Sequence, residues 1–223
     1  MRKEKDKIAF FDFCGTIVPF QSADKFVKFV IANYATPTIT CRAWAYRLLV
    51  GLHLIKRIEK WSKHQITSKK LILYQIKGLK ESTIEEAAKQ YFLQIIKPSL
   101  IPEIQTEIKK RQSEGYRIII VSGGYNVYIK YFMEYIGGSL IDVLATPFVF
   151  SNGRFTGKMG MDCMAGNKII YILRHLQHKN IYSVAYSDSP TDIPLFEFVD
   201  EAYFVISYPY SKKAKISTFL YQG

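Results

Sequence analysis

Four short polar clusters in this sequence contain residue types that could do chemistry, and each follows an apolar run or opens a helical pattern. They are residues 12–16 (Asp-Phe-Cys-Gly-Thr), residues 122–124 (Ser-Gly-Gly), Lys168, and residues 187–192 (Ser-Asp-Ser-Pro-Thr-Asp). Most of them lie far apart along the chain. A sheet whose strands end at these positions would bring them together, and they would then combine carboxylates, a lysine and flexible hydrogen-bond donors.

These residue types suit the transfer of a phosphoryl group. Asp12 could attack phosphorus and form an aspartyl-phosphate. Asp188 supplies a second carboxylate, and two carboxylates together with phosphate oxygens suit Mg²⁺. Ser122 and the backbone of Gly123 could donate hydrogen bonds to phosphoryl oxygens. Lys168 would neutralise charge on the transferring group.

The same residues also have ordinary structural interpretations. Asp12 could cap a turn, Ser122 could belong to a plain loop, and Lys168 could be one more helical lysine. Asp192 could hold Lys168 in place, or it could be the N-cap of a helix. Because all four clusters occur in this order and at expected strand ends, their joint presence favours the chemical interpretation.

The elements expected around the clusters alternate between strands and helices. Apolar runs at residues 7–13, 116–121, 181–187 and 202–206 are typical of strands buried on both faces of a parallel sheet. Helical spacing at residues 127–135 and 167–176 falls between the later runs. This alternation predicts a doubly wound α/β domain. In such a domain the ligand crevice lies beyond the carboxyl ends of the strands.

A helical segment is expected between the first and second strands. From about residue 22 to residue 113 the pattern is almost wholly helical, with breaks at Pro37 and Pro98. A capping box at residues 82–85 would start a helix that runs through Tyr91.

Asn152-Gly153 lies between two alternating runs and predicts a β-hairpin over residues 148–159. We therefore predict two domains. Residues 1–20 and 112–223 would form the α/β core, and residues 21–111 would form a helical cap.

Composition places the chain among globular proteins. Of its 223 residues, 48% are hydrophobic and 22% are charged, which excludes a disordered chain. No run reaches the roughly 18 apolar residues that a membrane span requires. Cys14, Cys41 and Cys163 are too scattered for a disulfide framework or a zinc site. Since the basic N-terminus has no small-residue cleavage site, we expect a cytoplasmic protein.

The net charge of +12 is concentrated in one segment. Residues 17–111 contain 17 basic and 7 acidic residues, which give that segment a formal charge of +10. Such a segment would attract phosphates, anionic lipid surfaces or nucleic acid, or it could simply be a solvated helical surface. Because no known nucleic-acid motif accompanies the charge, no nucleic-acid partner is expected.

The four clusters give the sequence a recognisable resemblance. Over roughly residues 7–206 it resembles the haloacid dehalogenase-like (HAD) hydrolase superfamily, in particular its phosphoserine-phosphatase-like branch. FFDFCGTIV matches the first motif, IIIVSGG the second, Lys168 the third and YSDSPTD the fourth. The resemblance implies a Rossmann-like parallel-sheet core with an inserted all-helical cap. It also implies Mg²⁺-dependent phosphoryl transfer with Asp12 as the nucleophile.

The resemblance further implies roles for single residues. The metal would be held by Asp12, Asp188 and the main-chain carbonyl of Cys14. Contacts to the phosphate would come from Thr16, Ser122, Gly123 and Lys168, with Asp192 in support.

Cys14 departs from the family pattern. The residue two positions after the nucleophile is usually a second Asp, which protonates the leaving alkoxide and then activates the attacking water. The metal contact at this position is through the main chain, so Cys14 should leave metal binding intact. A carboxylate acid/base is worth roughly 10²- to 10⁴-fold in rate. A thiol with a pKa of about 8.5 can donate a proton but is a poor base while it is neutral.

The expected substrate is a small phosphorylated metabolite. Serine-specific relatives have a glutamate shortly after the first motif, and Gln21 stands there in this chain, so phosphoserine itself is not expected. The basic cap is rich in aromatic residues, including Trp44 and Trp61. Such a cap would suit an anionic substrate with an apolar portion.

Three further hypotheses stay open beside a Mg²⁺-dependent phosphatase. The first is a catalytically impaired or regulatory phosphate-binding protein, which Cys14 would permit. The second is a phosphotransferase, in which slow hydrolysis leaves the phosphoryl group to another acceptor. The third is a lipid-phosphate phosphatase in peripheral contact with a membrane, suggested by the basic, aromatic cap and the apolar residues 48–55. The oligomeric state is left open.

Overall fold

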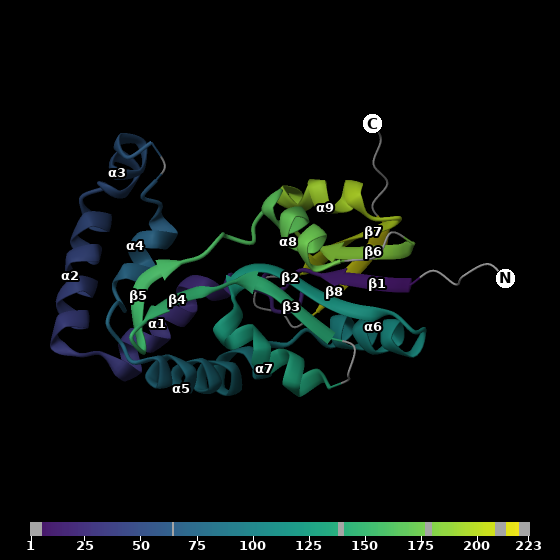
Figure 1. The fold of residues 1–223 in the computed structure, drawn as a ribbon, viewed down its shortest axis with the longest axis horizontal. Coiled ribbons are helices and arrows are strands. Elements are labelled where there is room, and N and C mark those ends of the chain that lie inside the picture. The colour runs from purple at the N-terminus through teal and green to yellow at the C-terminus, as the bar shows by residue number, and fades with distance from the viewer. Residues whose placement is uncertain (1–5, 64, 138–140, 177–179, 208–212, 219–223) are drawn as a thin grey trace.

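The core of the molecule is a six-stranded sheet with the strand order β3-β2-β1-β6-β7-β8 (Figure 1). The computed structural model describes residues 6–63, 65–137, 141–176, 180–207 and 213–218. The strands are β1 (Asp6–Phe11), β2 (Arg117–Tyr125), β3 (Ile141–Thr146), β6 (Ile181–Ser187), β7 (Glu201–Ser207) and β8 (Ala214–Thr218). Neighbouring strands are parallel except β7 and β8, which are antiparallel. From β1 the chain adds β2 and β3 on one side and then β6 and β7 on the other. The topological switch point of the sheet, where ligands bind in such folds, therefore lies between β1 and β6.

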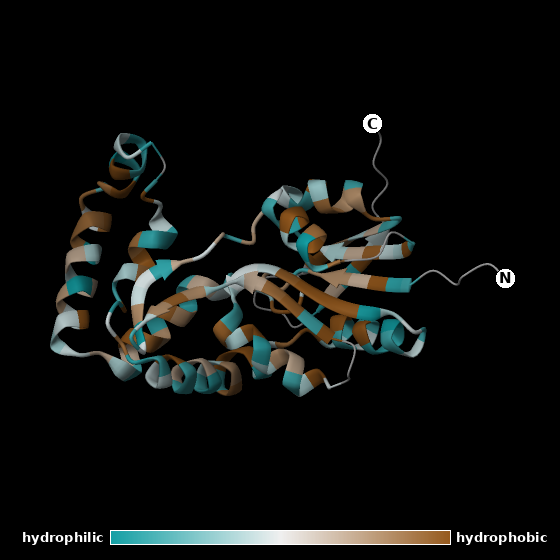
Figure 2. Cartoon of the chain, viewed as in Figure 1, coloured by the Kyte–Doolittle hydropathy of each residue, from teal (hydrophilic) through white to brown (hydrophobic). Residues whose placement is uncertain are grey.

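Strand β1 is buried on both faces because its residues are apolar at successive positions. Ala9 and Phe11 pack into the core on one face, and Ile8 and Phe10 pack into the core on the other. This follows from the two-residue period of a strand. The central strands are correspondingly hydrophobic along their length (Figure 2).

Helices cover both faces of the sheet. Side chains of α6 (Pro102–Ser113) and α7 (Asn126–Ile136) share the cluster that contains Phe11. Side chains of α8 (Asn167–His175) and α9 (Ile193–Phe198) share the cluster on the opposite face. The predicted doubly wound core is therefore confirmed.

The segment between β1 and β2 is helical, as predicted, and extends to one side of the sheet (Figure 1). Its helices are α1 (Ser22–Tyr34), α2 (Pro37–Gly51), α3 (Ile55–Trp61), α4 (Ser68–Tyr74) and α5 (Glu81–Tyr91). A π-helical turn and a 3₁₀ turn lead from α5 to α6. The proposed capping box at residues 82–85 is wrong. Helix α5 begins at Glu81, two residues earlier than a Ser82 N-cap would place it, and its N-cap Lys80 makes no side-chain cap.

The predicted hairpin forms from β4 (Phe148–Ser151) and β5 (Arg154–Met159). Its turn residues Asn152 and Gly153 both have positive φ, at 50° and 68°, which is the conformation that Asn-Gly favours. The hairpin lies against the inserted helices. The backbone N–H of Phe155 donates to the carbonyl of Leu79 at 2.8 Å, and that of Gly78 donates to the carbonyl of Phe155 at 2.8 Å.

Two strands of the sheet carry no clear sequence signal. In β3 the run Ile-Asp-Val-Leu-Ala-Thr is interrupted by Asp142, whose carboxylate is paired with Arg117 at 2.6 Å. Strand β8 lies at the sheet edge and is largely polar. The division at residue 111 stays a prediction, and α6, most of which precedes it, contacts β2 and β8. No described helix is both long and apolar enough to span a membrane.

Candidate functional site

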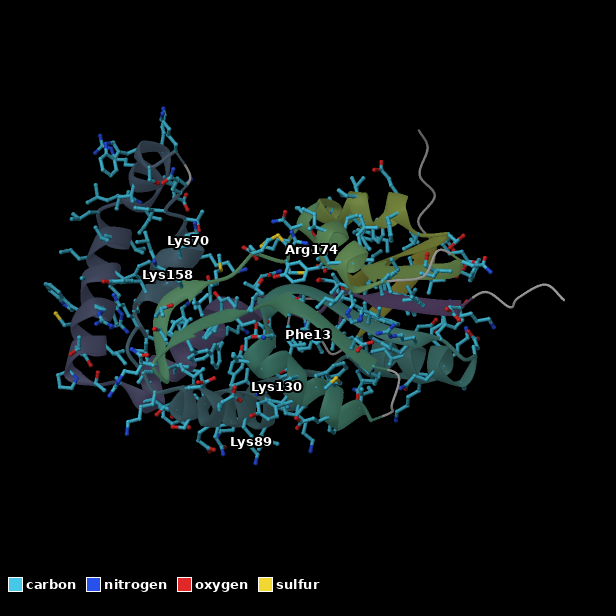
Figure 3. The ribbon with its side chains drawn as sticks, in the orientation of Figure 1. Phe13, Lys70, Lys89, Lys130, Lys158 and Arg174 are labelled. Atoms are coloured by element: carbon cyan, nitrogen blue, oxygen red, sulfur yellow. The ribbon has the colours of Figure 1, made fainter. Side chains whose placement is uncertain are left out.

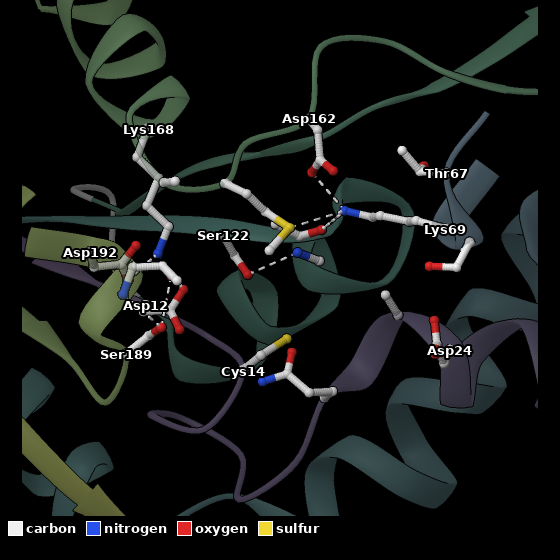
Figure 4. Close-up of a pocket in the computed structure, with 18 residues that line it drawn as sticks. Asp12, Cys14, Asp24, Thr67, Lys69, Ser122, Asp162, Lys168, Ser189 and Asp192 are labelled. Carbon is white, nitrogen blue, oxygen red and sulfur yellow. Dashed lines mark hydrogen bonds and ion pairs between the residues drawn. The ribbon is translucent and has the colours of Figure 1, made fainter. Parts of the chain in front are cut away.

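The polar clusters meet at the carboxyl ends of the central strands (Figure 4). Asp12 directly follows β1 and its backbone N–H donates to the carbonyl of Tyr186 at 2.9 Å. Ser122 lies in β2, and Ser187 ends β6. Lys168 lies in the first turn of α8. The sheet topology thus brings together residues that are as much as 175 positions apart in sequence.

The centre of the site is a buried ion-pair network around Lys168. Its Nζ lies 2.7 Å from Oδ1 of Asp12 and 2.5 Å from Oδ2 of Asp192. The hydroxyl of Ser187 donates to the same Asp192 oxygen at 2.6 Å. All three charged side chains are almost completely buried. Asp192 therefore pairs with the lysine and does not cap α9 with its side chain, and its supporting role in the site stays a prediction.

Burial and neighbouring charges together set the protonation of this network. Burial raises the pKa of the Asp12 carboxyl to about 7, although the charge of Lys168 opposes the rise. The charges of Asp192 and Asp188 add to the rise. Burial alone would lower the pKa of Lys168, but the carboxylates of Asp12 and Asp192 outweigh it and raise that pKa. The lysine stays a cation, and a further positive charge would favour ionised Asp12.

Asp188 is held beside the main chain of the first motif. Its backbone N–H donates to Oγ1 of Thr16 at 3.0 Å, and the Thr16 hydroxyl donates to Oδ1 of Asp188 at 3.1 Å. Gly15 has φ +84°, and an added Cβ there would lie 2.0 Å from Oδ2 of Asp188. Thr16 positions Asp188 in this structure, and a contact of Thr16 with phosphate stays a prediction.

Cys14 lies at one end of a buried chain of hydrogen bonds. Its Sγ lies 3.0 Å from Oγ of Ser22, which in turn lies 2.6 Å from the hydroxyl of Tyr128. The backbone N–H of Ser22 donates to the same sulfur at 3.5 Å. The backbone N–H of Tyr125 donates to the Tyr128 hydroxyl at 3.1 Å.

This chain is satisfied when every donor points toward the sulfur. In that arrangement the Tyr128 hydroxyl accepts from the backbone N–H of Tyr125 and donates to Ser22, and the Ser22 hydroxyl donates to Cys14. Cys14 also lines the cavity. Burial raises the pKa of Cys14, and the negative charge of Asp12 adds to this. The group is therefore a neutral thiol at neutral pH.

The second motif forms a close-packed turn at the end of β2. The backbone N–H of Gly124 donates to Oγ of Ser122 at 3.0 Å. An added Cβ at Gly123 would lie 2.3 Å from the side chain of Met164. A side chain at position 123 would therefore displace Met164, and the turn lines the cavity next to Lys168.

A cavity of about 440 Å³ opens over these groups. Its lining includes Asp12, Cys14, Ser122, Gly123, Lys168 and Asp192, together with Gln21, Asp24, Lys69, Asp162 and Met164. Asp188 and Thr16 are not among the lining residues. The site therefore has a wall of core residues and a wall from the inserted helices.

Lys69 and Asp162 are site residues that no sequence motif marked. Lys69, from α4, donates to the carbonyl of Gly123 at 2.7 Å and pairs with Oδ1 of Asp162 at 2.6 Å. Thr146 donates to the same two groups, at 3.2 Å and 3.0 Å. The inserted helices are thus tied directly to the turn of the second motif.

The residues present fit a magnesium ion. The negative charge of Asp188 helps to raise the pKa of Asp12, and the Gly15 contact places the Asp188 carboxylate against the main chain of the first motif. Hard oxygen donors of this kind suit Mg²⁺. Among the described residues, no group of three or more His, Cys, Asp or Glu side chains could hold a metal.

Comparison with known proteins decides the family. A family model described as haloacid dehalogenase-like hydrolase matches residues 9–197. The chain belongs to this family. The predicted superfamily and hydrolase class are thereby confirmed.

Individual relatives support the predicted branch. A phosphoserine phosphatase of Methanocaldococcus jannaschii is 23% identical over 199 residues, which cover 87% of this chain and 83% of the relative. A solved protein of unknown function from Bordetella pertussis Tohama I is 20% identical over 89% of both chains, with a TM-score of 0.71. A phosphoserine phosphatase structure, described as a phospho-aspartyl intermediate analogue, is 17% identical over 89% of this chain and 86% of that one, with a TM-score of 0.52. This HAD protein is therefore similar to the phosphoserine phosphatases.

Proposed function

We propose that this HAD protein is a Mg²⁺-dependent phosphatase that hydrolyses a small phosphorylated metabolite through an aspartyl-phosphate on Asp12. The observation that carries the proposal is the Asp12 carboxylate at the floor of the cavity, 2.7 Å from the buried ammonium of Lys168. A nucleophile beside a fixed cation suits a reaction in which a negatively charged phosphoryl group is transferred. The similar phosphoserine phosphatase described as a phospho-aspartyl intermediate analogue supports the same chemistry.

Each residue has a distinct task in this mechanism. A carboxylate oxygen of Asp12 attacks phosphorus, and the bond from phosphorus to the ester oxygen breaks. Lys168 offsets charge on the phosphoryl group, while Ser122 and the backbone of Gly123 donate hydrogen bonds to its oxygens. The thiol of Cys14 gives its proton to the departing alkoxide. Water then attacks phosphorus and loses a proton to the Cys14 thiolate, the bond from phosphorus to the Asp12 oxygen breaks, and phosphate leaves with both side chains restored.

Bound Mg²⁺ would supply positive charge to the phosphoryl oxygens. Asp12, Asp188 and the carbonyl of Cys14 are the proposed ligands. Asp188 owes its position to Thr16 and to the absence of a side chain at Gly15.

The substrate is proposed to be small and not phosphoserine. A cavity of about 440 Å³ suits a metabolite rather than a macromolecule. Gln21 lines it where a glutamate would receive an amino group in serine-specific relatives. Lys69 provides positive charge on the cap side. A cytoplasmic location and the lack of a nucleic-acid partner stay predictions.

A phosphotransferase is the second candidate, and Cys14 is the observation that favours it. Burial keeps the resting thiol neutral. When a good leaving group departs without taking the thiol proton, no base is left beside the aspartyl-phosphate to take a proton from water. The aspartyl-phosphate would then persist long enough to meet another acceptor.

The decisive experiment measures phosphate release from an aryl phosphate, with and without Mg²⁺, in wild-type protein and in Asp12→Asn. The variant should lose activity by several orders of magnitude, because the amide is not a nucleophile. Asp6→Asn, an exposed change on the same strand, is the matched control and should be neutral. Normal turnover by Asp12→Asn would refute the mechanism.

A second arm of the experiment separates the two candidates. Adding alcohol acceptors and measuring the transfer product should give mainly free phosphate for a phosphatase. Predominant transfer to the alcohol would identify a phosphotransferase. The substrate itself would come from a panel of phosphorylated metabolites assayed with Mg²⁺.

A further inference from the structure

The outward face of α2 carries an apolar stripe. Cys41, Trp44, Leu48 and Leu52 are three or four residues apart and so lie along one side of the helix and its C-terminal cap. The side chains of Trp44, Leu48 and Leu52 are 66%, 49% and 57% exposed. Ile39 and Ala43 are the buried residues of the same helix. Helix α2 therefore packs through one face and leaves a second apolar face uncovered by the described part of the chain.

Helix α3 follows α2 at the same end of the molecule (Figure 1). Trp61 lies at its C-terminal end and is 83% exposed. We call residues 37–63, which comprise α2 and α3, the tip. The tip is at the end of the molecule opposite the strands β6, β7 and β8 (Figure 1). It also contains both tryptophans of the chain.

The tip is strongly basic. It contains six Lys and Arg residues and one acidic residue, which give it a formal charge of +5. Its five exposed cations are Arg47, Lys56, Arg57, Lys60 and Lys63. None of them forms an ion pair with any residue that the structure describes. The single carboxylate, Glu59, accepts a hydrogen bond from the backbone N–H of Ser68 at 2.5 Å.

We propose that the tip binds peripherally to an anionic lipid bilayer. Tryptophan side chains favour the membrane–water interface. Leucine side chains would enter the acyl boundary, and unpaired lysines and arginines would meet lipid phosphates. The charge argues against a second copy of the chain as the occupant, because two tips of +5 would repel each other at close range. This proposal does not depend on the proposed function.

Binding at the tip would place the bilayer beside the cap side of the site. Helix α3 contacts α4, and α4 carries Lys69, which lines the cavity. The surface that meets the bilayer is thus one helix away from the site.

The test uses the full chain and its own tryptophans. Vesicles of phosphatidylcholine alone are compared with vesicles that also contain phosphatidylserine, by co-sedimentation and by fluorescence. The anionic vesicles should bind the protein and shift tryptophan emission to the blue, and brominated acyl chains should quench it. Added salt should weaken binding, because exposed charges are screened. Absence of both binding and the emission shift would overturn the proposal.

Matched variants locate the surface. Lys56→Gln with Arg57→Gln should weaken binding to anionic vesicles by about 30-fold. Lys89→Gln with Lys109→Gln removes the same charge from exposed sites on α5 and α6 and should have little effect. Lys89 lies well away from the tip (Figure 3).

Apolar variants and a self-association assay complete the test. Trp44→Ala with Trp61→Ala should also lose binding, while far-UV circular dichroism shows that the variant stays folded. If the Lys56/Arg57 variant and the Lys89/Lys109 variant lose vesicle binding equally, the tip is not a specific binding surface. Concentration-dependent dimers that disappear in the tryptophan variant, without vesicle binding, would show a second copy as the occupant.

Discussion

The sulfur of Cys14 lies 3.0 Å from the hydroxyl of Ser22, and Ser22 contacts that sulfur with its backbone N–H as well. Two donors therefore face the position where the family usually has a carboxylate. Such an arrangement would accept a carboxylate as readily as a thiol, since carboxylate oxygens are stronger acceptors. The protein around Cys14 thus retains a site for the acid/base group that the sequence has changed.

Cys14→Asp should therefore raise steady-state turnover, by roughly 10-fold or more, because a carboxylate can activate the attacking water. In the wild-type protein, the slow step should be hydrolysis of the aspartyl-phosphate. Aryl phosphates with good leaving groups should then give a burst of released phenol followed by a slow phase. Stopped-flow absorbance measures both phases. A loss of activity in Cys14→Asp would show that the thiol itself is required.

Tyr128 should act on catalysis through Cys14. In Tyr128→Phe the Ser22 hydroxyl loses its hydrogen-bond partner and is free to reorient, so its contact with the Cys14 sulfur is no longer fixed. We expect kcat to fall about 3- to 10-fold for substrates with poor leaving groups, because a loss of this size corresponds to the free energy of one hydrogen bond. KM should stay unchanged. The effect should vanish when Cys14 is replaced by Ala, and an undiminished effect in that background would contradict the relay.

The main site residues were predictable because strands of a parallel sheet deliver their carboxyl ends to one edge. Asp12, Ser122 and Asp188 lie at or next to the ends of apolar runs, so local sequence and topology together place them. The position of Lys168 was predictable because it lies at the start of a helix that packs on the sheet. For these residues, the apolar pattern of the strands in the sequence is enough to predict where they lie.

The residues contributed by packing had no such signal. Lys69 is one of many lysines in a basic helical segment, and only the placement of α4 against the hairpin brings it to Gly123. Ser22 and Tyr128 meet across 106 positions of sequence. Strands β3 and β8 were missed because a paired Asp142 and an exposed edge remove the apolar pattern on which the prediction depends.

Without metal, stability should fall as pH rises from about 4 to about 7. The folded protein raises the pKa of Asp12 from 3.8 to about 7, so between these values the folded state binds more protons than the unfolded state. The effect is roughly 4 kcal/mol at most. Thermal unfolding in EDTA should show it, and Asp12→Asn should flatten the profile. Mg²⁺ should restore stability at neutral pH, because it binds the ionised form. A flat wild-type profile would contradict the burial of this carboxyl.

Gly15→Ala should disrupt the proposed metal site. The backbone at φ +84° disfavours any side chain, and the added Cβ would lie 2.0 Å from a carboxylate oxygen of Asp188. Displacement of Asp188 should weaken the Mg²⁺ dependence of activity at least 10-fold, and the strain should cost about 1–2 kcal/mol of stability. Gly51→Ala is the control, since an added Cβ there meets no atom within 4 Å. An unchanged Mg²⁺ titration would argue against Asp188 as a ligand.

Lys69→Gln should separate the inserted helices from the turn of the second motif. The variant loses a half-buried ion pair with Asp162 and a charged hydrogen bond to the carbonyl of Gly123. Charged hydrogen bonds are worth about 1.5–3 kcal/mol, so kcat/KM for the metabolite substrate should fall about 10-fold or more, mainly through KM. Lys70→Gln is the matched control. That neighbouring lysine is exposed and donates only to the carbonyl of Gln65 among described groups.

Aryl phosphate serves as the comparison substrate in the Lys69 experiment. Because a simple aryl ester makes few contacts with the cap, its hydrolysis should be less affected than that of the metabolite. If Lys69→Gln and Lys70→Gln behave alike toward both substrates, the ion pair has no part in binding. If Lys69→Gln slows both substrates equally, its effect is on the turn that carries Ser122 and not on substrate selection.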